Sequence, residues 1–409
     1  MDYIDVNFLI RPIDTVYFGP PRSFSASENH RERSLFPPVP NTFQGMVRAK
    51  LLQAVHPPLD LHDWSDQARA KRESLVGTPE RLPGNWRLKG PLPAIIREAF
   101  HEDLEISQLE PWIPAPNFLM SKSGNAVDAP VIATPVSSTH PGLNDLGAST
   151  ILFGDPQREI LSSMGGWIGP DNLYFALTGK GNWKKEQHSP DYPPFISVEA
   201  NPGVAIDSRT GTARHSLLYF LETLRFKNGS GLMGVFSGTV NSRIREDALI
   251  YGTGAAGRKG RLVAFEKAPD LHPKWQDIMN GGHLPGSVEE DDRFWLVNLT
   301  PATLVKPGIP EKNPAVSGHA AFEILASLTG KPVYLGGYSM ATGKSRPNRP
   351  YAPVGSAWWI KIKGGDDKDR AKVLRSLNNV NLLANEAEAS FGFGHCVVGI
   401  SKKNKGSFS

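Results

Sequence analysis

The stretch GTGAAGRKGR (252–261) has the glycine content of a phosphate-binding loop. A P-loop requires the pattern G-x-x-x-x-G-K-[ST], in which the lysine binds phosphate and the hydroxyl binds Mg²⁺. Gly252 and Gly257 have the required spacing, but Arg258 occupies the lysine position and Lys259 the hydroxyl position. Because the magnesium ligand is missing, the sequence predicts a basic hairpin tip here instead of a nucleotide-binding loop.

Histidine, cysteine and acidic residues could form catalytic or metal sites, but their spacing favours structural roles. No histidine lies in an H-E-x-x-H pattern or near a C-x-x-C pair. Cys396, the single cysteine, lies in an apolar stretch, so we expect a buried thiol in a reducing, cytoplasmic compartment. The acidic run EEDD (289–292) is expected to form a solvated turn. We therefore predict no catalytic residue, no metal site and no cofactor.

Positive charge is concentrated in one part of the chain. Residues 331–363 include six basic residues and no acidic one. The segment GYSMATGKSRPNRPYAPVGS (337–356) is predicted to be a long loop that presents Lys344, Arg346 and Arg349 to phosphate groups. A solvated basic loop without a partner is the alternative, and this segment alone favours neither interpretation.

Two further segments combine turns with residue types that contact nucleic acid. In FGFGHCVVG (391–399), Gly392 and Gly394 alternate with two phenylalanines. Glycine lets a backbone approach a ligand and aromatic rings can stack on unpaired bases, but a tight turn with core phenylalanines is the stronger interpretation of this stretch alone. The stretch 199–226 is predicted to be a protruding hairpin, in which Arg209 and Arg214 bracket a Thr-Gly-Thr turn; a plain surface hairpin is the alternative.

The stretch RSLFPPVPNTFQGMVRAKLL (33–52) predicts a helix that begins at Asn41, with Asn41 and Gln44 forming a capping box. Its apolar residues fall on one side at helical spacing, and Gly45 and Arg48 fall on the other side. Glycine in a helix costs about 1 kcal/mol relative to alanine, so Gly45 needs a compensating role. Two roles are open: close packing against a neighbouring element, or room for RNA beside Arg48.

Short strands and a few helices must position these residues. The chain has 409 residues, a net charge of +4, 39% hydrophobic and 21% charged residues, 40 glycines and 35 prolines, which is typical of a globular protein rich in turns. We expect no signal peptide and no membrane span. The patterns predict strands at 3–10, 172–179, 216–226, 234–240, 261–267, 293–300, 356–364 and 395–400. They predict helices at 41–55, at 319–330 and from 366 onward.

Strand and helix patterns recur at both ends of the chain, which favours an α+β fold with two ferredoxin-like (RRM-like) domains and a β-hairpin insertion. The predicted domains are an N-terminal ferredoxin-like domain with insertions at 1–165, a β-rich insertion that includes the predicted hairpin at 166–260, and a C-terminal ferredoxin-like domain at 261–409.

The blocks RPIDTVYF (11–18), RSF (22–24) and SLFPPVPNTFQGMVRAKLL (34–52) resemble the N-terminus of the third-subunit family of type III-B CRISPR Cmr effector complexes, within the RAMP superfamily. The resemblance covers most of the chain in the same order, through GWIGPDNLYFALTG (166–179), GVAIDSRTGTARHSLLY (203–219), NLTPATL (298–304), RPYAPVGSAWW (349–359) and GFGHCVVG (392–399). One departure is GGYSMATGK (336–344), where the family pattern has Gly-Trp and this chain has Gly-Tyr.

The resemblance implies a non-catalytic RNA-binding subunit of a cytoplasmic ribonucleoprotein in antiviral defence, with two ferredoxin-like domains and a projecting thumb hairpin. The implied partners are the repeat-derived 5′ tag of the guide RNA (crRNA), the large Cas-ten subunit, the backbone RAMP subunits and, indirectly, the target RNA; no membrane is implied. Carried over by motif, the implied RNA contacts are Arg22, Ser23, Gly45, Arg48, Arg209, Arg214, Lys344, Arg346, Arg349, Gly392 and Gly394.

Two other functions are open. One is a metal-independent, repeat-processing endoribonuclease of the same superfamily, with His30 in the stretch SENHRERS as its acid or base. An exposed loop histidine is the simpler interpretation of His30, and such enzymes are usually much shorter than this chain. The other function is a scaffold that contacts only protein.

Overall fold

The computed structural model describes residues 2–19, 31–101, 104–121, 130–137, 150–153, 162–257, 260–306, 308–312, 322–339 and 342–400. Helices and several sheets are mixed along the chain, in agreement with the predicted α+β class. Contacts divide the chain into two compact units. Unit 1 comprises Met1–Ile95, Pro194–Ala268 and Tyr334–Arg349, and unit 2 comprises Ile96–Pro193, Pro269–Val333 and Pro350–Ser409.

This division differs from the contiguous boundaries expected at 165/166 and 260/261. The N-terminal strand β1 (Asp2–Pro12) pairs antiparallel with β15 (Ser230–Val240) and with β17 (Arg261–Lys267). Strand pairing therefore joins segments that the sequence assigned to three different domains.

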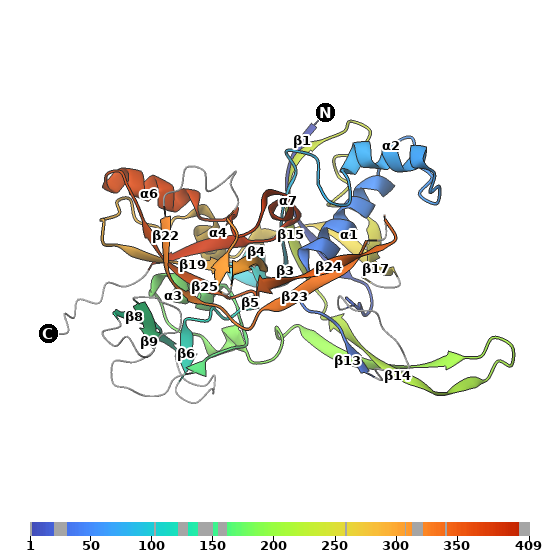
Figure 1. Cartoon of the computed structure of the whole chain (residues 1–409), viewed down its shortest axis with the longest axis horizontal. Helices are drawn as coiled ribbons and strands as arrows, with labels where there is room; N and C mark the ends of the chain where they lie inside the picture. The colour runs from blue at the N-terminus through green and yellow to red at the C-terminus, as the bar shows by residue number, and fades with distance from the viewer. Residues whose placement is uncertain are drawn as a thin grey trace. The chain divides into compact units, whose positions relative to one another are not determined.

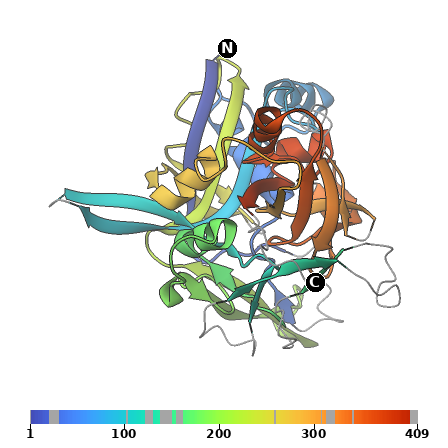
Figure 2. The same cartoon turned by 90° about the vertical axis from the view of Figure 1, so that its left-hand side faces the viewer.

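Unit 1 is built on one antiparallel sheet. Within this unit the strand order is β16-β17-β1-β15-β3, and β1 and β15 run side by side over most of their length (Figure 2). If β1, β3, β15 and β17 are numbered in chain order, the order across the sheet is 4-1-3-2. The other elements that lie wholly or partly in this unit are β2 (Arg31–Arg33), α1 (Pro40–Gln53), α2 (Asp66–Val76), β3 (Arg87–His101), β13 (Ile196–Ile206), β14 (Ala213–Phe226), β16 (Thr253–Ala256), β23 (Val333–Ser339) and β24 (Lys344–Ala352).

Helix α1 packs its apolar side on this sheet, as predicted. Phe43 is fully buried and its ring stacks on Phe8 of β1, with 5.8 Å between ring centroids. Gly234 of β15 makes this packing possible, since a Cβ there would lie 2.3 Å from the Phe43 ring. The predicted capping box is wrong: the helix begins at Pro40, its N-cap is Val39, and no side chain caps it.

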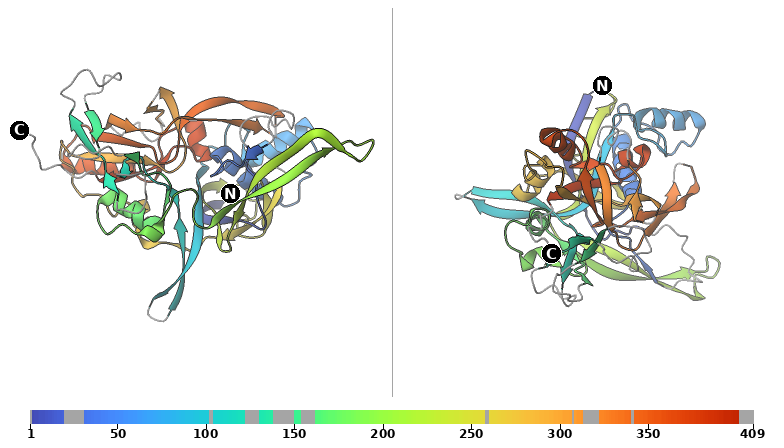
Figure 3. Two further views of the ribbon diagram at one scale, coloured as in Figure 1. Left: turned by 90° about the horizontal axis from the view of Figure 1, so that it is seen from below. Right: turned by 60° about the vertical axis from the view of Figure 1, so that its left-hand side comes forward.

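The predicted protruding hairpin is present. Strands β13 and β14 pair antiparallel, and the hairpin reaches out from unit 1 as a long two-stranded arm (Figure 3). At the tip, Asp207 and Thr212 are joined by a backbone hydrogen bond of 2.8 Å from N to O, and the Asp207 carboxylate accepts from the backbone of Arg209.

The basic segment 337–356 is not the long loop that we expected. It contains the end of β23 and all of β24, which are neighbouring strands drawn in orange in Figure 1. Lys344 and Arg346 thus lie on an extended strand, and the pairing of β24 with its neighbouring strands sets their positions.

Unit 2 contains a second antiparallel sheet with the order β22-β25-β19-β27-β26. Numbered in chain order, β19, β22, β25 and β27 again give 4-1-3-2 across the sheet. The elements of this unit are β4 (Leu104–Pro111), β5 (Ile113–Pro114), β6 (Leu119–Ser121), β7 (Val131–Ile132), β8 (Thr134–Ser137), β9 (Thr150–Phe153), β10 (Ser162–Ser163), β11 (Trp167–Ile168), α3 (Pro170–Thr178), the 3₁₀ helix η1 (Lys185–Gln187), β12 (His188–Ser189), β18 (Asp270–Leu271), α4 (Pro273–Asn280), β19 (Arg293–Asn298), β20 (Ala302–Lys306), β21 (Ile309–Pro310), β22 (Phe322–Leu328), β25 (Ala357–Ile362), α6 (Asp367–Ser376), β26 (Val380–Asn381), α7 (Glu386–Phe391) and β27 (His395–Ile400).

Two predicted elements of unit 2 are wrong. The stretch 172–179 is not a strand: it lies in α3, which has Pro170 in its first turn and is closed by Gly179 in the left-handed conformation. The stretch 319–330 is not a helix where it is described: it contains strand β22, which pairs with β25. Its apolar residues fit both periodicities, and pairing with β25 decides between them.

Two other predictions for unit 2 are confirmed, the buried thiol of Cys396 and the turn at 289–292. Cys396 is fully buried in β27, and the run 289–292 is a turn that leads into β19.

Within the described part of the chain, no group of three or more histidine, cysteine or acidic residues could hold a metal ion. None of the helices described is long and apolar enough to cross a membrane.

The carboxylate of Asp171 joins α3 to its surroundings in unit 2. It is 5% exposed and accepts from Lys184 at 2.8 Å and from Lys274 at 2.6 Å. Burial alone would raise the pKa of Asp171, but the hydrogen bonds from the two lysines outweigh burial and hold the pKa below its ordinary value. The ion pair therefore stabilises the fold at neutral pH, and this contribution is lost as the pH falls through the lowered pKa.

Asp171→Asn is expected to lower the free energy of unfolding at pH 7 by about 1–3 kcal/mol, because two partly exposed lysines lose their counter-ion. Urea denaturation followed by tryptophan fluorescence measures this change. The difference from wild type should shrink as the pH falls below the ordinary aspartate pKa of about 3.9 and through the lowered pKa of the folded protein, because the carboxyl group is then protonated. Asp291→Asn is the control, since Asp291 is 87% exposed and its loss should change stability by less than about 0.5 kcal/mol. Equal effects of the two substitutions would contradict a stabilising role for the buried pair.

Candidate RNA-binding site

Two of the predicted RNA contacts meet in unit 1. Arg48 lies on α1, Arg346 lies on β24, and both side chains are half-buried. Arg346 donates to Oδ1 of Asn41 at 3.4 Å and to the carbonyl oxygen of Pro79 at 2.8 Å. Arg48 donates to Oε1 of Gln44 at 3.2 Å and to the carbonyl oxygen of Thr78 at 3.0 Å. The strand and the helix are thus held together by two guanidinium groups, and we call this pair the arginine pair.

The backbone acceptors of the arginine pair come from the turn after α2. Arg48 also donates to the carbonyl oxygen of Gly77, so residues 77–79 present three consecutive carbonyls to the two guanidinium groups. Gly77 has a φ of +78°, and a Cβ there would lie 2.4 Å from the carbonyl oxygen of Arg81. Only glycine fits this turn, which fixes the direction of the carbonyls.

The arginine pair keeps its positive charge. Burial and then the charge of Arg346 lower the pKa of Arg48 to about 10, while Glu73 and Glu80 act in the opposite direction. At neutral pH Arg48 is still protonated, and its described acceptors are neutral oxygens. An anion placed between the two side chains would offset both the burial and the mutual repulsion.

Gly45 lies one turn before Arg48 on α1. It is exposed, and a Cβ built on it would have no described atom within 4 Å. Of the two roles left open for this glycine, the described residues do not provide close packing against a neighbouring element. Gly45 therefore leaves an open stretch of helix backbone beside the arginine pair.

Gly45→Ala is expected to stabilise the protein by up to about 1 kcal/mol, since alanine is the better helix former and nothing obstructs its methyl group. If RNA approaches the helix here, the same variant should bind RNA more weakly although it is more stable. Thermal unfolding and fluorescence anisotropy with labelled single-stranded RNA measure the two effects. Gly84→Ala is the control, because Gly84 is also exposed with open space around it. Unchanged RNA affinity of Gly45→Ala would remove Gly45 from the site.

The remaining basic residues of the prediction differ in their placement. Lys344 and Arg349 are exposed on β24, the strand that carries Arg346. Arg209 is exposed at the tip of the β13–β14 hairpin, and Arg214 lies in β14 near the same tip. Arg22, Ser23 and His30 lie outside the described residues.

Gly392 and Gly394 have roles within unit 2 that require glycine. Gly392 closes α7 with a φ of +108°, and its carbonyl oxygen accepts from Thr300 at 2.6 Å. Gly394 has a φ of +64°, and a Cβ there would lie 2.4 Å from the backbone of Leu383. Phe391 and Phe393 are 3% and 0% exposed, so their rings fill the core and are not a surface for base stacking. The tight-turn interpretation of this stretch is correct.

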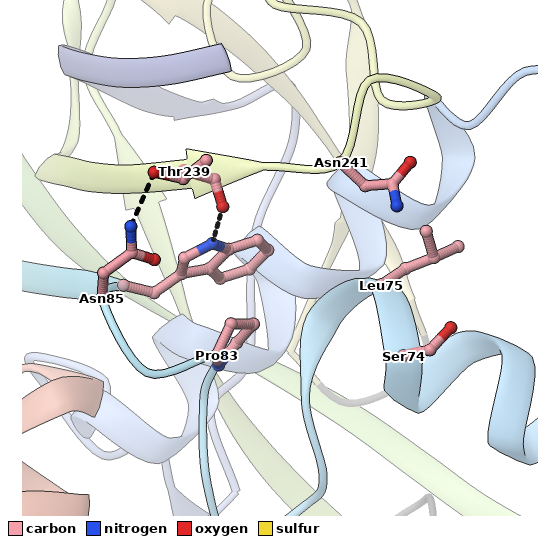
Figure 4. A pocket seen from close by; sticks show the side chains of 7 residues that line it. Ser74, Leu75, Pro83, Asn85, Thr239 and Asn241 are labelled. Atoms are coloured by element: carbon pink, nitrogen blue, oxygen red, sulfur yellow. Dashed lines mark hydrogen bonds between the residues drawn. The ribbon is translucent and has the colours of Figure 1, made fainter. Parts of the chain in front are cut away.

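A cavity of about 390 Å³ also opens in unit 1 (Figure 4). Its polar groups are largely used inside the protein: Nε1 of Trp86 donates to the carbonyl oxygen of Thr239 at 2.8 Å, and Nδ2 of Asn85 donates to Oγ1 of Thr239 at 2.6 Å. None of the predicted site residues lines it; the lining residues are Ser74, Leu75, Pro83, Asn85, Trp86, Thr239 and Asn241.

A sequence model of the family of CRISPR-associated proteins Cas_Cmr3 matches residues 8–401. The chain belongs to the Cas_Cmr3 family. The resemblance carried by the N-terminal block and the later motifs is thereby confirmed.

Solved structures similar to this Cas_Cmr3 chain include chains of a Cmr complex and of a Csm cassette. A chain of the type III-B Cmr-beta complex bound to cognate target RNA and AMPPnP is 14% identical, with a TM-score of 0.41, and the match covers 93% of this chain and 99% of that chain. A chain of the Csm1–Csm4 cassette in complex with AMPPNP is 13% identical, with a TM-score of 0.30, and the match covers 88% and 89% of the two chains. No curated protein matches the Cas_Cmr3 chain.

Proposed function

We propose that this Cas_Cmr3 protein is the non-catalytic subunit of a cytoplasmic type III-B Cmr effector complex that holds the repeat-derived 5′ tag of the guide RNA. Its proposed partners are that tag, the large Cas-ten subunit, the backbone RAMP subunits and, through the guide, the target RNA. The observation that carries the proposal is the arginine pair beside the open backbone of Gly45, in a chain whose family is established.

The arrangement of charge and backbone fits a single-stranded phosphate chain. Guanidinium groups bind phosphate in two-pronged fashion, and they do so best where the backbone of the ligand can come close. Arg48 and Arg346 supply the charge, and Gly45 leaves room for the approach. Lys344 and Arg349 on β24 provide further charge along the same strand.

We further propose that each unit is built on a ferredoxin-like domain. The antiparallel order 4-1-3-2 in both sheets supports this, because it is the order that two split β-α-β units produce. In unit 1 helix α1 lies between strands 1 and 2 of the chain order, and in unit 2 helix α6 lies between strands 3 and 4. RNA-binding sheets of this type commonly bind unpaired nucleotides through side chains on their strands.

The test is a comparison of two RNAs of equal length and composition on the full chain. One carries the repeat-derived 5′ segment of the guide that co-purifies with the complex, and the other carries the same nucleotides in scrambled order. We expect tighter binding of the first RNA, with affinity that falls steeply as salt rises. Equal affinity for both RNAs, or none, would reject tag binding.

The same incubation separates the binding function from the endoribonuclease. With repeat RNA and EDTA present, we expect the RNA to remain intact over hours. Cleavage that is abolished by His30→Ala would establish the repeat-processing enzyme in its place. A complex that assembles normally while its Cmr3-type subunit shows no RNA crosslink would favour the protein scaffold.

A further inference from the structure

Strand β23 of unit 1 exposes two aromatic rings. Tyr334 is 63% exposed and Tyr338 is 60% exposed, whereas Leu335 and Ser339 are 6% and 7% exposed. The two tyrosines are thus exposed on a strand whose residues Leu335, Gly336 and Ser339 are buried. Neither ring has a role in the core of the unit.

A glycine lies between the two tyrosines on β23. Residues four apart on a strand lie on the same side at a separation of about 13 Å. Gly336 lies midway between them without a side chain, and a Cβ there would lie 2.3 Å from Oδ1 of Asn348. The amide of Asn348 on β24 thus occupies the place that a side chain at Gly336 would take.

Positive charge adjoins the rings on the neighbouring strand. Lys344 is exposed at the start of β24, and Arg346 farther along β24 belongs to the arginine pair. The ring of Tyr338 reaches back over the turn, since its hydroxyl lies 3.7 Å from the position of a Cβ on Gly343. Exposed rings beside cations are the combination that binds unpaired nucleotides: bases stack on the rings and phosphates pair with the cations.

We propose that Tyr334 and Tyr338 form a stacking platform for two unpaired bases of the guide RNA, with the connecting phosphates directed to Lys344 and the arginine pair. This inference rests on the proposed function and deepens it, because it assigns base contacts to a site that so far has only phosphate contacts. The spacing of about 13 Å expected for strand residues four apart is several times the rise of about 3.4 Å per nucleotide of a stacked strand. The platform therefore takes bases that are splayed apart, not two stacked neighbours.

The irregular backbone of β23 favours nucleobases over an added protein strand. Gly337 has a φ of +111°, which breaks the regular row of backbone groups that strand addition needs. Base stacking uses the faces of the rings and does not require a regular row of backbone groups. A partner protein on the same face is therefore the outcome that the experiment must separate from RNA.

The experiment measures RNA affinity of the full chain by fluorescence anisotropy. The probe is the single-stranded repeat-derived 5′ segment of the guide, labelled at its 3′ end. A second series consists of the same labelled RNA with a single abasic nucleotide, placed at each position in turn. Tyr334→Ala and Tyr338→Ala are each expected to lower the affinity about tenfold, whereas Tyr334→Phe and Tyr338→Phe are expected to retain it. Tyr251→Ala is the matched control, because Tyr251 is 67% exposed in the same unit and lies outside the platform.

The abasic set identifies the stacked base for each ring. For one position per tyrosine, removal of the base should weaken binding to wild type about tenfold and have no further effect on the alanine variant of that tyrosine. Additive losses at every position would show that the rings do not stack on bases and would overturn the platform.

The outcomes also separate this inference from the proposed function. If wild type binds the RNA and the Arg48 and Arg346 variants weaken it while the tyrosine variants do not, the platform is rejected and tag binding stands. If wild type does not bind the RNA, the proposed function itself fails. If the alanine variants keep full RNA affinity but no longer assemble with the other subunits, the face docks a protein and the inference is rejected.

Discussion

The double variant Arg48→Ala/Arg346→Ala is expected to lose about 100-fold or more in affinity for the repeat-derived RNA. Each guanidinium makes charge-assisted hydrogen bonds, worth about 1.5–3 kcal/mol when the partner is charged. The slope of log K against log salt should also fall by about 1.4 in magnitude, because each phosphate contact of a single strand contributes about 0.7. Anisotropy titrations over a range of KCl concentrations measure both quantities.

Two further variants separate the specific effect of the arginine pair from the effect of positive charge alone. Arg346→Lys keeps the charge but loses the two-pronged geometry, and we expect an intermediate loss of affinity with an unchanged salt slope. Arg87→Ala is the matched control, since Arg87 is also a half-buried arginine of unit 1 that donates to carbonyl oxygens, at Gly84 and Trp86. If Arg87→Ala weakens RNA binding as much as the variants of Arg48 and Arg346 do, the loss of affinity reflects the loss of any positive charge, and the binding site lies elsewhere.

Gly394→Ala is expected to destabilise unit 2 by about 2–5 kcal/mol. A left-handed φ costs a non-glycine residue about 1–2 kcal/mol, and a methyl group 2.4 Å from the Leu383 backbone adds the cost of overpacking, about 1–3 kcal/mol. The fall in the urea midpoint and in the melting temperature measures this change. RNA affinity of the fraction that remains folded should match wild type, because the glycine is buried.

Gly286→Ala is the control for this substitution. Gly286 lies in the same unit, is exposed, has no left-handed φ and has open space around its Cα. It should change the free energy of unfolding by less than about 0.5 kcal/mol. A Gly394→Ala protein that is as stable as wild type but binds RNA weakly would return this glycine to the list of RNA contacts.

The parts of the fold that the sequence predicted are those in which local pattern and tertiary pairing agree. Alternation in 3–10 and in 356–364 predicts β1 and β25, and the acidic start of the helix after 365 predicts α6, which Asp366 caps by accepting from Lys368 and Asp369. The helix that carries Arg48 was predicted from the spacing of its apolar residues, although its first residue and its cap were not.

The errors occur where two patterns compete. In 172–179 aromatic and apolar residues favoured a strand, and the stronger signals were Pro170 at the start and Gly179 at the end of a helix. In β22 the apolar spacing suited a helix, and a partner strand more than thirty residues later in the chain decided the structure. Local spacing cannot report a partner that is distant in sequence.

The candidate site was predicted residue by residue but not as an assembly. The types of Arg48 and Arg346 marked them as phosphate ligands, and nothing in the sequence showed that they meet. Their meeting depends on carbonyls of the turn at 77–79, and backbone carbonyls carry no residue-type signal. Tyr334 had a signal that could have been read, since two tyrosines four residues apart in a strand share a side.

The three-segment composition of unit 1 also constrains how the protein is made. Because the segment Tyr334–Arg349 completes this unit, Arg346 can meet Arg48 only after most of the chain has been synthesised. At about 5–20 residues per second a ribosome needs roughly 20–70 s to reach that point, while α1 has long been outside the ribosome. A nascent or prematurely terminated chain that ends before Arg346 thus carries Arg48 without its partner, and the arginine pair forms only after translation has passed residue 346.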